Sequence, residues 1–91
     1  MPTGFAVLSP ENYAAVCWPG VRETAHGLAV EAWIVLGATI AHELGHVLLQ
    51  SKTHSSGVMS YRLDLPQVRA AGRGELRFAP SDARRLRDAA R

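Results

Sequence analysis

Apolar residues recur at helical spacing through the middle of the chain and predict one long helix over residues 29–50. The stripe expected to face the core consists of Trp33, Gly37, Ile40, Leu44, Val47 and Leu48. The adjoining face carries Val35, Ala38, Thr39, His42, His46 and Leu49. Because the two sets are neighbours on one helix, we expect the two histidines to border the core rather than open solvent.

Shorter elements are predicted on both sides of this helix. Residues 5–8 are an apolar run typical of a strand, and the following Ser-Pro-Glu predicts a short helix over about residues 9–17. Trp18-Pro19-Gly20 should break that helix. After residue 50 we expect a turn-rich loop over 51–57, a helical turn at 67–71, a weak strand-like alternation at 75–78 and a last helix at 80–90.

The pattern as a whole predicts a mainly α fold, α+β at most. We expect a long central helix, a short N-terminal helix, a C-terminal helix and at most one or two short strands. The 91 residues suit one small domain over 1–91, and a hydrophobic content of 47% excludes a disordered chain. A domain of this size buries little surface, so a bound metal would add stability. The single cysteine, Cys17, permits neither an intrachain disulfide nor a cysteine-based zinc site.

Charge is spread unevenly along the chain. Residues 1–50 carry one cation and four acids, whereas residues 51–91 carry nine cations and four acids. We interpret the basic half as a solvated, arginine-rich surface. The competing interpretation is a patch for acidic peptides or nucleic acid. No aromatic residues interleave the arginines and no nucleic-acid motif is visible, so no nucleic-acid partner is expected.

Neither a leader nor a membrane span is expected. The first ten residues lack a basic segment and an adequate apolar run, which argues against a signal peptide. Residues 28–49 are apolar but contain Glu31, Glu43 and two histidines, which argues against a span. The default location is therefore cytoplasmic, or secreted if the chain is a fragment.

Candidate chemistry lies in the segment His42-Glu43-Leu44-Gly45-His46. Residues four apart share one face of a helix, so both imidazoles can grip one Zn²⁺ ion. Glu43 is rotated away from that face and can reach a water on the metal. This is the H-E-x-x-H pattern, in which the glutamate serves as general base for metal-assisted hydrolysis.

A hydrolytic zinc site needs three protein ligands and one open position. His54, in the loop after the helix, is the first candidate for the third ligand. Glu75 and Asp64 are alternatives, and a chance match to the short pattern is a further possibility. His26, at an expected helix end, is assigned no ligand role.

These residues resemble the metzincin type of zinc peptidase. H-E-L-G-H, then His54, then Gly57-Val58-Met59-Ser60-Tyr61 is similar to that clan's helix, third histidine and methionine turn, and is closer still to small bacterial proteins with an H-E-x-x-H-x7-H motif. The resemblance implies a minimal zincin-like domain, with Met59 beneath the metal and Tyr61 near the metal or the developing oxyanion. It covers roughly residues 36–86.

Two departures from that clan stand out. His54 arrives two residues later than the usual third histidine, and most of the expected N-terminal sheet is missing. Substrate peptides commonly pair with an edge strand in such sites. Either residues 5–8 supply that edge, or the chain is a copy shortened at its N-terminus.

The expected function is that of a zinc-dependent metalloendopeptidase acting on a peptide or protein substrate. Zn²⁺ would be held by His42, His46 and His54, with Glu43 as general base and Tyr61 as oxyanion donor. One alternative is a non-catalytic domain in which zinc only stabilises a small core. The other alternative is a basic nucleic-acid-binding module that carries the motif by accident.

Overall fold

The computed structural model describes residues 2–90 and has two strands and four helices. In chain order these elements are β1 (Gly4–Val7), β2 (Tyr13–Val16), α1 (Trp18–Leu28), α2 (Ala32–Leu49), α3 (Leu65–Gly72) and α4 (Pro80–Ala89). The mainly α class, the long central helix and the C-terminal helix are confirmed. The two strands form an antiparallel hairpin in which Gly4 lies opposite Val16 and Val7 opposite Tyr13.

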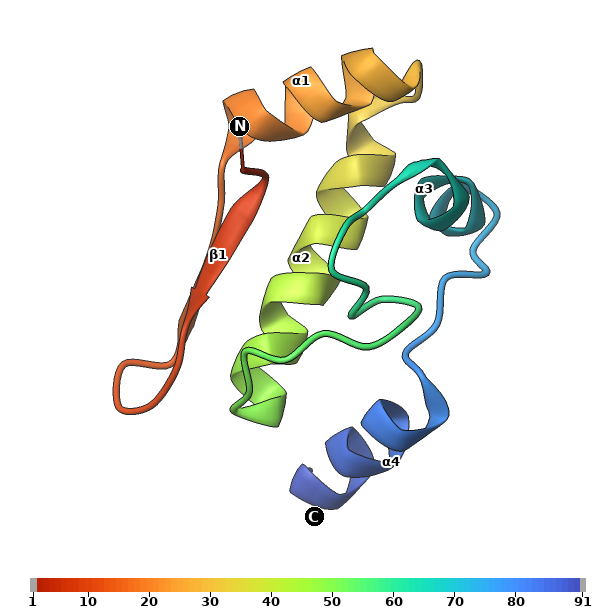
Figure 1. Ribbon diagram of the computed structural model, residues 1–91. Coiled ribbons are helices and arrows are strands. Elements are labelled where there is room, and N and C mark those ends of the chain that lie inside the picture. The colour runs from red at the N-terminus through yellow and green to blue at the C-terminus, as the bar shows by residue number, and fades with distance from the viewer. Residues whose placement is uncertain (1, 91) are drawn as a thin grey trace.

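α2 is the element on which the others assemble, since it contacts both strands and each of the other three helices. In Figure 1, α1 lies across one end of α2, β1 runs along its side, and the long loop after α2 turns back over it. α2 is followed by its C-cap residue Gln50, which is in the left-handed conformation with φ 49°. The chain therefore reverses there and returns alongside the helix it has just left.

Among the described residues, α2 is also the one helix long and apolar enough to cross a membrane by length and composition. Core helices of globular proteins satisfy the same criterion, and five other elements pack against α2. Several large apolar residues of α2 nevertheless remain exposed.

The main core lies where α1, α2 and α3 meet. Val21, Val35 and Val68 are fully buried there, and Ala25 is buried beside them. A second buried pair, Val58 and Met59, lies under the later half of α2.

The expected core stripe of α2 is wrong. Trp33 is 64% exposed and Leu48 59%, and Gly37, Ile40 and Leu44 are exposed as well. The buried positions are Val35, Ala38, Thr39, His42, Glu43, Gly45 and His46. Both faces of α2 carry apolar residues, so periodicity could not decide which one the sheet and the other helices would cover.

The short helix expected over residues 9–17 is also wrong, because residues 13–16 form β2. Ser, Pro and Asn favour tight turns as well as helix starts, and residues 8–12 make the hairpin turn, with Asn12 left-handed at φ 53°. The Gln50 amide fastens this turn to the end of α2: its nitrogen donates to Asn12 Oδ1 (2.8 Å) and its oxygen accepts from the Ser9 N–H (3.0 Å). Pro19 does not break a helix but occupies the first turn of α1.

The later elements follow the prediction more closely. α3 is longer than the single turn expected, and residues 75–78 do not form a strand but one isolated bridge between Gly57 and Phe78. That bridge brings the loop after α2 beside the segment before α4. Gly57 is left-handed at φ 64°, and a Cβ added there would collide with the Arg77 carbonyl oxygen, so glycine is required at this position.

Two glycines in α2 should respond oppositely to alanine. A Cβ at Gly45 would collide with Met59 Sδ and lie 3.1 Å from the Phe78 ring, whereas a Cβ at Gly37 meets nothing within 4 Å. Gly37→Ala should stabilise the fold by up to about 1 kcal/mol through helix propensity. Gly45→Ala should lower the stability by about 1–3 kcal/mol because Met59 is displaced. Urea unfolding followed by circular dichroism measures both, and equal stabilisation by the two variants would contradict this packing.

Candidate metal centre

His42 and His46 lie one turn apart on the buried face of α2, and each ring is held by a backbone carbonyl. His42 Nδ1 lies 2.8 Å from the Val58 carbonyl oxygen, and His46 Nδ1 lies 2.7 Å from that of Ser51. Both acceptors belong to the loop that follows the helix. His42 is 8% exposed and His46 is 4% exposed, so their rings have little freedom to rotate away.

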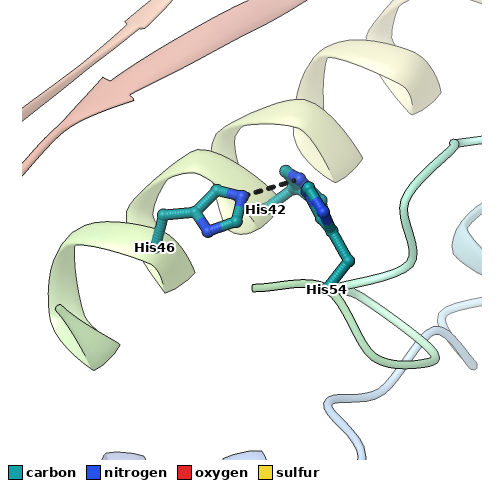
Figure 2. A group of neighbouring side chains, drawn as sticks. All are labelled: His42, His46 and His54. Carbon is teal, nitrogen blue, oxygen red and sulfur yellow. Dashed lines mark hydrogen bonds between the residues drawn. The ribbon is translucent and has the colours of Figure 1, made fainter. Parts of the chain in front are cut away.

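These two bonds determine which ring nitrogens are free. A carbonyl oxygen can only accept, so each Nδ1 must carry the proton and each neutral ring presents a bare Nε2. The two Nε2 atoms face each other at 3.1 Å (Figure 2). Two lone pairs at that distance repel unless a cation lies between or beside them. A hydrogen bond from Nδ1–H to a backbone carbonyl is the usual support for a metal-binding histidine.

His54 completes a group of three imidazoles. One ring nitrogen from each of His42, His46 and His54 lies within 4.8 Å of the other two. The His54 ring stacks on His42 with centroids 5.3 Å apart and lies edge-on to His46 at 4.9 Å. Figure 2 shows it reaching in from the loop on the side opposite the helix. The three histidines can therefore hold a metal ion.

The charge state of His54 also suits a ligand. Partial desolvation of its ring, and then repulsion from His46 and His42 whenever those rings are protonated, lower the pKa of His54 below its ordinary value of 6.5. A lowered pKa keeps this imidazole neutral at pH 7, with a lone pair available to a metal.

The loop that carries His54 is anchored to α4 and to the segment just before it. Ser55 Oγ donates to Asp82 Oδ2 at 2.5 Å, and the Val58 N–H donates to the Arg77 carbonyl oxygen at 2.8 Å. Asp82 is only 7% exposed, although it is a carboxylate in the first turn of an amphipathic surface helix. Sequence reasoning missed this role. An acidic residue in a first helical turn is common, so nothing in the sequence distinguishes Asp82 from an ordinary charge at a helix N-terminus.

Glu43 lies beside the histidines, on the side of α2 that faces β1, and is 8% exposed. A Cβ added at Gly4 of β1 would lie 3.2 Å from Glu43 Cγ and 3.1 Å from Thr39 Cγ2. The strand therefore passes directly over this part of the helix. Beside this contact a cleft of about 800 Å³ opens between β1, α2 and the loop after α2. Its lining includes Glu43, all three clustered histidines, residues 2–6 and residues 61–64.

Met59 and Tyr61 take different places around the centre. Met59 is 1% exposed and packs under Gly45. Gly45 lies between the two helical histidines in the sequence. Gly45 therefore admits a neighbouring side chain rather than a neighbouring backbone. Tyr61 is 78% exposed, lines the cleft, and lies edge-on to His54 with centroids 5.2 Å apart. It borders the open side of the site.

The structure does not bring the alternative third ligands into the group. Glu75 is exposed and paired with Arg73 at 2.9 Å. Asp64 lines the cleft but is the N-cap of α3, where its own N–H donates to Gln67 Oε1. His26 lies in the last turn of α1, outside the group. Of the three candidates for the third ligand, His54 is the nearest to His46 in the sequence, and it is the one that joins the group in space.

Comparisons of the chain with protein-family models, with curated proteins and with solved structures give no match. The geometry of the site itself therefore carries the functional argument.

Removing His54 should abolish tight metal binding while leaving the fold intact. His54 is exposed and its ring contacts the other imidazoles, so His54→Ala removes a donor without opening the core. Wild-type protein loaded with zinc and desalted should retain one ion per chain by mass spectrometry, and His54→Ala well below one. His26→Ala is the matched control and should retain one. Equal retention by wild type and His54→Ala would show that the third ligand lies elsewhere.

Proposed function

We propose that the protein is a zinc-dependent hydrolase of peptide bonds, related in its chemistry to the metzincin type of peptidase. The observation that carries the proposal is the position of Glu43, buried at the edge of a cleft beside three converging imidazoles. Three histidine donors with one open position is the ligand set of a catalytic zinc site, whereas structural zinc sites are closed by four protein ligands.

The chain's own groups can be given roles around such an ion. A zinc ion held by His42, His46 and His54 would supply an activated water and polarise the substrate carbonyl. Glu43 would take the proton of the attacking water and deliver it to the leaving amine. Its burial beside β1 limits the positions open to the side chain, which would favour proton transfer at a fixed geometry. The carbonyls of Ser51 and Val58 would hold the two helical rings in their ligand tautomer.

The open side of the cleft suits the remaining roles. Tyr61 lies next to His54 at the rim, where a phenol O–H could donate to the developing oxyanion. Met59 would form the floor beneath the ion. Residues 4–6 of β1 form one wall, so the strand expected to serve as an edge does border the site. A substrate peptide could lie along it in extended form.

A non-catalytic zinc domain is the second candidate, because one observation favours it. The loop over residues 51–64 lacks helix and extended strand in the described structure, and two of its carbonyls are tied to the histidines of α2. An ion shared by the helix and this loop would stabilise the small fold directly. This candidate gives Glu43 no task.

Exchange of Glu43 for glutamine separates the two candidates. Glu43→Gln keeps the size and most of the packing of the side chain but removes the base. We expect it to retain one zinc per chain and to lose at least about 10²-fold in peptide hydrolysis, the usual contribution of a general base. The assay is cleavage of a denatured protein mixture, read by mass spectrometry of the new termini. The exposed Glu11 provides a control variant, Glu11→Gln, which should cleave like the wild type.

A wild type that binds zinc and yields no new termini would favour the stabilising role. A Glu43→Gln variant that cleaves normally would contradict the proposed mechanism.

A further inference from the structure

The free edge of β1 is turned toward the cleft. The Thr3 carbonyl accepts from the Cys17 N–H at 2.7 Å, and Phe5 and Val7 lie opposite Ala15 and Tyr13 in the same register. The odd-numbered residues therefore direct their N–H and C=O groups toward β2. By the alternation of an antiparallel pair, Gly4 and Ala6 direct theirs to the other side. Both residues line the cleft.

Lys52 occupies this edge. Its ammonium donates a hydrogen bond to the Ala6 carbonyl oxygen, across the cleft from the loop to the strand. Lys52 is the chain's only lysine and stands between Ser51, whose carbonyl holds His46, and His54. The Ser51 carbonyl next to Lys52 is hydrogen-bonded to His46, and the Lys52 side chain reaches the position where a bound peptide would make its own hydrogen bond.

A peptide lying along β1 would displace this ammonium. An added strand needs the Ala6 carbonyl as the acceptor for one of its own N–H groups. Lys52 would then lie beside the peptide without its present partner. Among residues 2–90, no carboxylate lies within ion-pair distance of Lys52, and Arg62 adds a second cation to the cleft lining. Glu43 and Asp64 also line the cleft, but neither pairs with Lys52. Lys52 is an exposed residue, so its released ammonium would be hydrated, and a carboxylate on the peptide would replace that water with a charge-assisted hydrogen bond.

We propose that Lys52 is a specificity-determining residue that makes the site select extended peptides with an aspartate or glutamate opposite Ala6. The inference rests on the proposed function for its substrate class. It is nevertheless a statement about binding, so it can be tested without turnover.

The binding test uses zinc-loaded protein with the Glu43→Gln substitution, immobilised and exposed to an end-blocked octapeptide library. In the library, each position in turn carries Glu, Gln or Lys, and retained peptides are quantified by mass spectrometry. We expect Glu to be retained over its isostere Gln on the order of tenfold at one position, which corresponds to one charge-assisted hydrogen bond. High salt should reduce the preference.

Added substitutions at residue 52 identify the cause. Lys52→Arg should keep the preference, Lys52→Met should remove it and Lys52→Glu should turn it toward Lys-containing peptides. Arg84→Glu changes the net charge equally from an exposed site on α4, away from the cleft, and should leave the preference intact. Zinc content and circular dichroism verify that each variant folds.

The outcomes of these experiments test the role of Lys52 and the proposed peptidase activity separately. Absence of any Glu preference, retention of no peptide, or a preference that survives Lys52→Met overturns the role of Lys52. The same library incubated with protein that keeps Glu43 then tests hydrolysis separately. Selective binding without cleavage contradicts the proposed peptidase and leaves Lys52 as a recognition residue, whereas cleavage without Glu preference contradicts Lys52 alone.

Discussion

The two hydrogen bonds from the Nδ1 atoms of His42 and His46 to backbone carbonyls are the interactions on which the site depends. They join α2 to the loop that follows it, and they leave both Nε2 atoms bare and facing each other at 3.1 Å. The loop can make them because Gln50 reverses the chain immediately after the helix. One local conformation therefore positions the acceptors and also brings His54 back to the same point. A zinc ion would link α2 to the loop after it, whose histidines already converge on one point.

Close packing around α2 makes this arrangement possible in so small a protein. Gly45 admits Met59 beneath the histidines, Gly57 lets the loop cross the Arg77 carbonyl, and Gly4 lets β1 lie against Glu43. Each is a place where a Cβ would force backbone or side chain to move. The metal loop is also fixed from the far side, because Ser55 bonds to the buried carboxylate of Asp82. The candidate catalytic groups are thus held by elements from both ends of the chain.

The sequence predicted the long helix and the grouping of the three histidines better than it predicted the packing of the chain. The histidine pair, His54 and the long helix followed from spacing and from helical periodicity, which are local properties. The exposed face of α2 was misjudged because Trp33, Ile40, Leu44 and Leu48 are as apolar as a core stripe. Residues 13–16 became a strand because pairing with β1 and packing on α2 outweighed a local helix signal. Asp82 and Lys52 could not be found, since their roles depend on partners 27 and 46 residues away.

X-ray absorption at the zinc edge tests the central claim most directly, because it counts the imidazoles around the ion. Zinc-loaded wild-type protein should show a four-coordinate shell at about 2.0–2.1 Å with the outer-shell scattering of three histidines. His54→Ala, examined at saturating zinc, should show two. A shell dominated by oxygen donors, or an unchanged histidine count in His54→Ala, would contradict a three-imidazole centre and the mechanism built on it.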